Sequence, residues 1–351
     1  MATKSNPGNF FEDFKIGQII RHATPRTVTD GDASLYTALT GSRYAVFSSD
    51  EFANACGLGH APIDPLLAFH IVFGKTVPDV SLNAVANLGY AEGRFLAPVF
   101  AGDTLTSVSE VIGVKENSNG KTGVVHVRTN GVNQHGESVI SYVRWVMVNK
   151  RDEKAPAPNA VTPNLAEAVA PSDLVVPQGL AFTDYDWDLA GSPYAFEDYA
   201  VGEKIDHVDG MTVEEAEHQI VTRLYQNTAK VHFDARMQKD SRFGKRLIYG
   251  GVAISIARSL AFNGLANAAL ILAINAGRHV SPLFAGDTVY AWSEVLGKIG
   301  LSNGVGALRL RLVATKDKPC ADFPYKNAAG EYDPAVILDF DYWAAIPQKR
   351  A

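Results

Sequence analysis

The chain has 351 residues, more than one compact core usually holds, and its 46% apolar and 20% charged residues are typical of a globular protein. A net charge of −6 argues against nucleic acid as a partner, and no apolar run is long enough to cross a membrane. Two cysteines, Cys56 and Cys320, are too few for a disulfide scaffold or a four-ligand zinc site. We therefore expect no metal site. Because the N-terminus lacks the layout of a signal peptide, we expect a cytoplasmic protein.

Most of the chain consists of two similar sequence repeats. Residues 93–104 read GRFLAPVFAGDT and residues 277–288 read GRHVSPLFAGDT, an offset of 184. Residues 11–14, FEDF, return as FEDY at 196–199 with an offset of 185. Several matched segments in one order indicate a duplicated domain.

A polar, proline-rich segment separates the two repeats and predicts a linker. The chain therefore divides into an N-terminal repeat at 1–150, a linker at 151–193 and a C-terminal repeat at 194–351. The linker ends in aromatic residues such as Trp187, which are costly to leave in water, so part of it is expected to pack down.

In chain order, each repeat shows the same pattern: an opening segment of mixed helical spacing, an apolar stretch long enough for a buried helix, and then β-type runs. The opening segments cover 27–41 and 212–226, the buried helices 66–73 and 252–262, and the β-type runs 104–114, 123–129 and 139–148 in the first repeat and 288–296, 306–315 and 336–345 in the second. Asn119-Gly120 and Asn303-Gly304 are hairpin signals. The pattern predicts an α+β fold in which an antiparallel sheet wraps around a central helix.

A buried helix followed by Gly-Asp-Thr at the start of a strand resembles the hotdog fold. The longer pattern Arg-x-x-x-Pro-x-Phe-Ala-Gly-Asp-Thr, present in both repeats, is similar to that of the MaoC-like, or (R)-specific enoyl-CoA hydratase, group. The resemblance covers nearly the whole chain and implies a double hotdog of two fused repeats. The segment FGKRLIYGG at 243–251 and the chain length resemble those of the mesaconyl-CoA hydratase (β-methylmalyl-CoA dehydratase) branch of this group.

The resemblance implies that the chemistry lies in the second repeat. The group carries the motif Asp-x-Asn-Pro-x-His before its central helix, and the matching window here runs from Asn227 to His232. His232 keeps the histidine, but Asn227 replaces the catalytic aspartate. In the first repeat Phe47 stands at the histidine position, so this repeat is expected to be catalytically silent and to shape the substrate pocket.

The resemblance also implies an oxyanion site at the start of the second central helix. The His-Gly pair of the group becomes Tyr249-Gly250 here, followed by Gly251, and the Gly250 amide is the expected donor to the thioester oxygen. Tyr249 and Gly251 are candidate substrate contacts. The first repeat has Asp64-Pro65 in this place, and proline has no N–H to donate.

Hydration of an enoyl thioester needs a base for water, a proton for C2 and stabilisation of charge on the thioester oxygen. An imidazole such as His232 can serve the first two. Asn227 cannot act as a base, although it can hold and orient a water molecule. Either His232 works nearly alone or a carboxylate elsewhere assists it; Asp234, the nearest, is expected to be a structural or capping residue, and His70 a core residue with its hydrogen bonds satisfied.

Candidate cations for the CoA phosphates lie just before the second central helix. They are Lys239, Arg242, Lys245 and Arg246. A free carboxylate on a branched dicarboxylyl substrate would also need a cation, for which Arg43 and Arg246 are candidates.

Three functions remain open at this point. A hydratase would add water reversibly to an enoyl-CoA, a hotdog thioesterase would release free CoA, and a non-catalytic acyl-CoA binding protein would do neither. The histidine in the hydratase-type window favours the hydratase, with a CoA thioester as the partner, no separate cofactor, and a homodimer expected from the resemblance.

Overall fold

The structure is a computed structural model that describes residues 4–349, and its centre is one antiparallel sheet. The ten strands have the order β1-β3-β4-β5-β2-β7-β10-β9-β8-β6, so each repeat supplies five neighbouring strands. They are β1 (Ile19–Thr27), β2 (Ala84–Phe95), β3 (Thr104–Glu116), β4 (Thr122–Val132), β5 (Ser138–Asn149), β6 (Lys204–Thr212), β7 (Leu270–His279), β8 (Thr288–Gly300), β9 (Val305–Lys316) and β10 (Val336–Pro347).

The two repeats meet where β2 pairs with β7. Tyr90 lies opposite Gly277, and Arg94 opposite Ala273, in antiparallel register. A Cβ atom at Gly277 would lie 2.7 Å from Cδ2 of Tyr90, so a glycine is needed for the two strands to approach with this ring between them. The sheets of the two repeats are therefore continuous through a buried seam, which carries residues of both repeats toward the same helices.

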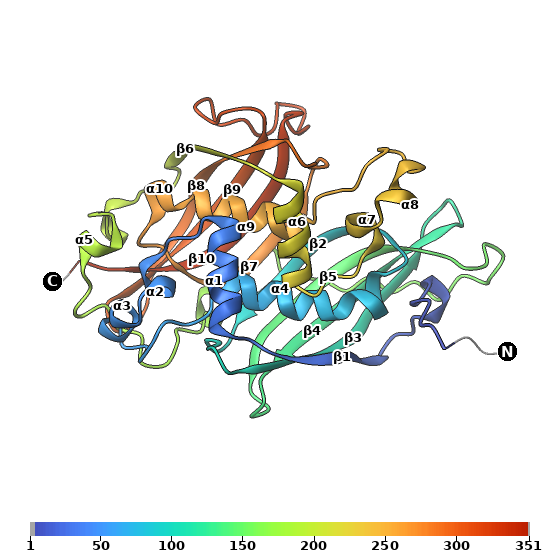
Figure 1. The fold of residues 1–351 in the computed structure, drawn as a ribbon, viewed down its shortest axis with the longest axis horizontal. Helices are drawn as coiled ribbons and strands as arrows, with labels where there is room; N and C mark the ends of the chain where they lie inside the picture. The colour runs from blue at the N-terminus through green and yellow to red at the C-terminus, as the bar shows by residue number, and fades with distance from the viewer. Residues whose placement is uncertain (1–3, 350–351) are drawn as a thin grey trace.

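Two central helices lie on one face of the sheet (Figure 1): α4 (Pro65–Thr76) and α9 (Gly250–Leu260). Helix α4 begins with Pro65, whose fixed φ suits the first helical position, and Asp64 caps it by accepting from the Leu66 amide at 2.9 Å. Residues 66–76 of α4 and 251–260 of α9 are all buried, which explains why both helices are apolar all round.

Two of the remaining helices lie across the central pair, and the others are short. Helix α1 (Asp30–Thr40) contacts α6 (Glu215–Leu224), and the two cross in front of α4 and α9 in Figure 1. The others are α2 (Ala45–Ser48), α3 (Asp50–Ala55), α5 (Trp187–Ala190), α7 (Lys230–Phe233), α8 (Ala235–Lys239) and α10 (Phe262–Leu265). Within residues 4–349, every helix is too short or too polar to cross a membrane.

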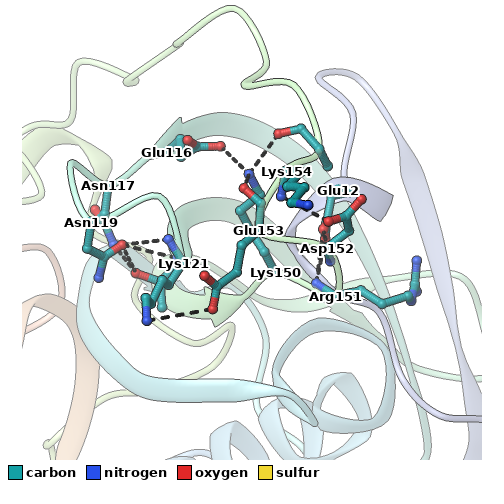
Figure 2. Close-up of polar contacts among 12 residues, drawn as sticks. Glu12, Glu116, Asn117, Asn119, Lys121, Lys150, Arg151, Asp152, Glu153 and Lys154 are labelled. Carbon is teal, nitrogen blue, oxygen red and sulfur yellow. Dashed lines mark hydrogen bonds and ion pairs between the residues drawn. The ribbon is translucent and has the colours of Figure 1, made fainter.

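The beginning of the linker is tied to the N-terminal repeat. Figure 2 shows Lys150 reaching Glu116, with Nζ and Oε2 2.9 Å apart, while its ammonium also donates to the Ala155 carbonyl at 2.8 Å. On the other side, the backbone amides of Arg151 and Asp152 donate to the Glu12 carboxylate at 2.9 and 2.8 Å. The contacts of Glu116 and Glu12 therefore fix the start of the linker where it leaves β5.

Further along, the linker packs on the sheet, as its aromatic residues led us to expect. Val169 and Leu180 are buried in one cluster with Leu270 and Leu272 of β7. These two leucines alternate with Ile271, which faces the central helices, so the linker covers the opposite face of β7. Trp343 of β10 fixes it there, since its indole Nε1 donates to the Val169 carbonyl at 3.2 Å.

The α+β double-hotdog prediction is confirmed in its main elements. Both central helices, both opening helices and all six predicted strands are present, and residues 117–121 and 301–304 form the predicted hairpin turns. Four strands were not predicted, namely β1, β2, β6 and β7. Two of these, β2 and β7, join the repeats, and their small residues, glycines and irregular pairing obscure the alternation that marks an exposed strand.

Candidate active site

His232 lies on α7, in the loop that crosses from α6 to α9. Its Nδ1 is 2.9 Å from the Leu247 carbonyl oxygen. A carbonyl only accepts, so Nδ1 carries the proton and Nε2 keeps its lone pair. Burial lowers the pKa of this half-buried imidazole to about 4, although the Leu247 carbonyl opposes the shift. His232 is therefore neutral at pH 7, with a free basic nitrogen.

Helix α6 holds this loop in place through two neighbouring side chains. Gln219 Nε2 donates to the backbone carbonyl of His232 at 2.8 Å, and His218 Nε2 accepts from the backbone amide of Tyr249 at 3.0 Å. Burial, together with the nearby His232, lowers the pKa of His218 to about 3, so His218 stays neutral and able to accept. The two residues fix His232 relative to the start of α9.

The N-terminus of α9 presents unused donors. The N-cap residue Tyr249 makes no side-chain hydrogen bond to the helix, and the amides of Gly250 and Gly251 have no acceptor among the described residues. Both glycines are crowded: a Cβ atom at Gly250 would lie 2.3 Å from Cε1 of His279, and one at Gly251 would lie 2.7 Å from Cε1 of His70. Backbone N–H groups and the helix dipole make this helix end suited to a developing negative charge.

His279, at the end of β7, is the second histidine of the site and was not predicted. Its ring lies against Gly250, and its Nε2 is 3.2 Å from the hydroxyl of Tyr90 on β2. Burial and the nearby His232 lower the pKa of His279 to about 4. Since Tyr90 belongs to the first repeat, the site combines residues of both repeats.

A third histidine, His70 of α4, corrects an expectation. It is buried at 0% exposure, but neither ring nitrogen has a hydrogen-bond partner among the described residues, so it is not the satisfied core residue that we expected. Its ring lies 5.8 Å from that of Tyr249, whose buried hydroxyl also lacks a partner. Tyr249 in turn lies 5.4 Å from His232. Unpartnered polar groups thus continue inward from the catalytic candidates.

Asn227 and Asp234 are both engaged in local structure. Asn227 is 4% exposed, and its side-chain oxygen accepts from the Ala229 amide at 2.9 Å, which forms the turn before α7. The prediction that Asp234 is a capping residue is confirmed, because its carboxylate accepts from the Met237 amide at the start of α8. Neither residue supplies the missing carboxylate in this geometry.

Of the four predicted phosphate-binding cations, Lys239 ends α8, and Arg242, Lys245 and Arg246 follow on the segment that leads to α9. Lys239, Arg242 and Lys245 are exposed, and the Lys245 ammonium lies 4.2 Å from the centre of the Phe284 ring. Arg246 is half-buried and pairs with Glu215 at 2.5 Å, the one salt bridge of these four cations in the described chain. Three cations thus remain available near the site.

Arg43 is not brought to the site. Its guanidinium carbon lies 4.7 Å from the ring centre of Phe262, which follows the C-terminal end of α9, whereas Gly250 begins that helix. Figure 1 shows the same separation, with α2 and α7 at opposite ends of the helical layer. Phe262 also packs edge-on against Tyr44, so this end of α9 is aromatic.

At the equivalent point of the first repeat, the end of α4 is closed. Asp64 occupies the Leu66 amide, Pro65 has no N–H, and burial raises the pKa of Asp64 to about 6. A small apolar pocket of about 30 Å³ lies beside it, lined by Phe95 and, from the linker, Val175 and Pro177. Where the second repeat has histidines and free amides, the first has apolar side chains and a capped helix.

No group of three or more metal-ligating side chains suited to a metal ion occurs in residues 4–349.

Comparisons with known proteins assign the fold and the family. A structure from Mycobacterium tuberculosis described as a double hotdog superimposes with a TM-score of 0.76, at 24% identity, over 96% of this chain and 98% of that one. The structure of a putative MaoC domain dehydratase from Chloroflexus aurantiacus superimposes with a TM-score of 0.97, at 61% identity, over 99% of this chain and all of that one. The fold is thus the double hotdog of MaoC-like dehydratases.

The family is more specific than the fold. The profile of the mesaconyl-CoA hydratase family matches residues 1–320. The chain is 61% identical to a β-methylmalyl-CoA dehydratase of C. aurantiacus, over 99% of its length and all of that protein. It is 64% identical to a mesaconyl-CoA hydratase of Cereibacter sphaeroides, over 98% of its length and all of that protein. The chain belongs to the mesaconyl-CoA hydratase family.

His279 could have been found from the repeats alone. At the 184-residue offset its counterpart is Phe95, and at the 185-residue offset the counterpart of His232 is Phe47. At both positions the first repeat has phenylalanine and the second repeat has histidine. Only the exchange of Phe47 for His232 coincides with a known motif. Tyr90 gave no such signal, because its contact with His279 depends on the pairing of two strands that were not predicted.

Proposed function

We propose that this protein catalyses the reversible addition of water to mesaconyl-CoA, giving β-methylmalyl-CoA. The observation that carries the proposal is the geometry around Gly250: a neutral imidazole with a free Nε2, a second imidazole and two free backbone amides surround the start of α9. Family membership and identities of 61% and 64% to proteins named for this reaction support the same substrate.

His232 acts as the base in this proposal. Leu247 holds its Nδ1 proton, so Nε2 can accept a proton from water as the oxygen attacks C3 of the enoyl group. The low pKa keeps the imidazole neutral near pH 7, and general base assistance of this kind is usually worth about 10²–10⁴ in rate. In the reverse reaction the imidazolium returns this proton to the departing hydroxyl.

The amide of Gly250, with that of Gly251 beside it, stabilises the negative charge that moves onto the thioester oxygen. These amides are fixed by α9 and lie at its positive end, so little reorganisation is needed. Loss of one donor in such a site typically costs about 10²–10³ in kcat.

His279 fills the role left open by Asn227. Its ring lies against Gly250, beside the place where the thioester would bind, and Tyr90 orients its Nε2. We assign it to proton transfer at C2: the proton that His232 takes from water passes to one nitrogen of the neutral His279, whose other nitrogen delivers a proton to C2, so both imidazoles end neutral. Asn227 shapes the loop and can orient water through its remaining amide protons. With two imidazoles, neither step requires a carboxylate.

The rest of the proposal concerns the first repeat and the assembly. Residues 1–150 form the silent repeat that shapes the pocket, 151–193 the linker and 194–351 the catalytic repeat. The exposed cations Lys239, Arg242 and Lys245 bind the CoA phosphates, and no separate cofactor takes part. We include a cytoplasmic homodimer in the proposal, to be tested by fractionation and by sedimentation.

The direct test measures water addition to mesaconyl-CoA, crotonyl-CoA and a longer enoyl-CoA, with wild type and His232→Ala. We expect mesaconyl-CoA to be hydrated and the variant to lose at least about 10²-fold in kcat. Release of free CoA, detected with a thiol reagent, would instead identify a thioesterase. Binding without turnover, or equal activity in the variant, contradicts the proposed function.

A further inference from the structure

Arg144 is a buried cation without an anion. It lies on β5 with 0% exposure, and its guanidinium carbon is 4.2 Å from the ring centre of Phe73. Its Nη2 donates to Thr76 Oγ1 at 2.7 Å and to Ser81 Oγ at 3.3 Å, and its Nε has no partner. All of these neighbours are neutral.

Buried charges in proteins are normally paired, because a guanidinium removed from water loses its hydration. In residues 4–349, no aspartate or glutamate forms a salt bridge with Arg144. Burial lowers the pKa of Arg144. The phenols that would oppose this shift, Tyr142, Tyr90 and Tyr249, have raised pKa values themselves and are neutral at pH 7. The guanidinium therefore lacks a negatively charged partner, which a bound carboxylate would supply.

Arg144 adjoins the candidate active site. Phe73, which carries the guanidinium on its face, lies 5.8 Å from Tyr249, and Tyr249 lies 5.4 Å from His232. Tyr90 also lies near Arg144 and makes the hydrogen bond to His279. Two separate routes thus lead from the guanidinium to the histidines, one through Phe73 and Tyr249 to His232 and one through Tyr90 to His279.

The substrate of the proposed function brings the missing anion to this place. In the mesaconyl group the free carboxylate is attached to C3, the carbon that receives water, so its cation has to lie beside the catalytic histidines. Arg43 lies past the opposite end of α9, and Arg246 is already paired with Glu215. We propose that Arg144 binds the free carboxylate of the dicarboxylyl substrate and so selects it over monocarboxylic enoyl-CoA thioesters, an inference that rests on the proposed function.

The second repeat contains a matched counterpart. Arg258 of α9 is also buried and lies 5.6 Å from the ring centre of Tyr342, so here the helix carries the arginine and the strand the aromatic ring. Its Nη2 donates to the carbonyl oxygens of Ala268 and Ala269, and its Nε and Nη1 have no partner among the described residues. Arg258 lies in the last turn of α9, whereas Gly250, against which His279 packs, begins that helix. Because it is an unpaired buried arginine away from the histidines, Arg258 provides the control.

The test compares Arg144→Met and Arg144→Lys with Arg258→Lys, using mesaconyl-CoA, its monomethyl ester and crotonyl-CoA. We expect both Arg144 variants to lose at least about 100-fold in kcat/KM with mesaconyl-CoA, and at most a few-fold with the two substrates that lack the free carboxylate. Arg258→Lys should keep the wild-type ratio between substrates. Equal losses on all three substrates, or no loss on mesaconyl-CoA, would overturn the assignment.

A binding measurement on the wild type needs no variant. Titration calorimetry with succinyl-CoA and butyryl-CoA compares ligands of similar length that differ in the terminal carboxylate. Succinyl-CoA should bind at least about 10-fold more tightly, and equal or weaker binding overturns the inference. If this preference holds while no enoyl-CoA is hydrated, the carboxylate site stands and the proposed hydratase function fails; if mesaconyl-CoA is hydrated without the preference, only the carboxylate site fails.

Discussion

The imidazole of His279 occupies the space that any side chain at Gly250 would need. A Cβ atom at Gly250 would lie 2.3 Å from Cε1 and 2.5 Å from Nε2 of that ring. The contact explains why the residue that presents the free amide has to be glycine, although its φ is not positive. It also means that the expected oxyanion donor and the second imidazole are positioned by one another.

Gly250→Ala is therefore expected to damage catalysis by displacing His279 and the start of α9. We expect kcat to fall by about 10²–10³, with a small change in KM. Steady-state kinetics with mesaconyl-CoA measure the effect. Gly31→Ala is the control, since a Cβ atom there meets only Thr29 Oγ1 at 3.5 Å and alanine favours the helix. Equal effects of the two substitutions would exclude a special role for Gly250.

His279→Asn tests the second imidazole. If His279 transfers the proton at C2, its loss should lower kcat by about 10²–10⁴, and Tyr90→Phe should have a smaller effect in the same direction. His207→Asn is the matched control, because His207 is also buried in the second repeat but is bound to the Asn263 carbonyl at 2.6 Å and Ser293 Oγ at 2.8 Å. Its replacement should lower the melting temperature and leave kcat nearly unchanged. Wild-type kcat in His279→Asn would remove this residue from the mechanism.

Sequence patterns alone predicted the elements whose local signal agrees with their surroundings. Both central helices are buried on all sides, and Asp64-Pro65 is a standard helix start, so α4 and α9 were recognisable. The duplication predicted two similar halves. His232 could be identified from the sequence because it falls on a family motif.

The parts that were missed depend on contacts between repeats. The hydrogen bond of Tyr90 to His279 joins residues 189 positions apart, across strands that pair only because the two sheets fuse. Arg144 reads as an outward-facing cation in a strand, and only the fold shows that it is buried without an anion. Arg43 was a candidate for the cation that binds the substrate carboxylate, but it lies at the other end of α9.

The docking of the linker can be tested at a close backbone contact. A Cβ atom at Gly57 would lie 2.1 Å from the carbonyl oxygen of Gly179, so Gly57→Ala should push the linker away. Gly59→Ala has nearly the same cost in backbone conformation, with φ of +79° against +80°, but has free space around it. We expect Gly57→Ala to be less stable than Gly59→Ala by about 1–3 kcal/mol in urea denaturation. Equal stability of the two variants would show that the linker is not held at this point.

Buried histidines make stability depend on pH in a stated direction. Burial lowers the pKa of His70 and His218 to about 3, and of His207, His232 and His279 to about 4. These groups bind protons in the unfolded chain below about pH 6.5, while in the folded protein they remain neutral until about pH 4. Their effect on stability is therefore absent above pH 7, and stability falls as the pH is lowered from 6.5 toward 4.

Asp64 acts in the opposite direction, because its raised pKa of about 6 lets the folded state take up its proton first. It offsets one histidine, so the remaining groups should still give a clear loss. Each histidine contributes a slope approaching about 1.4 kcal/mol per pH unit. Urea denaturation between pH 8 and pH 5 measures the free energy of unfolding, and His207→Asn should reduce the slope by the share of one proton. A free energy of unfolding that stays constant or rises between pH 6.5 and pH 5 would contradict neutral burial of these histidines.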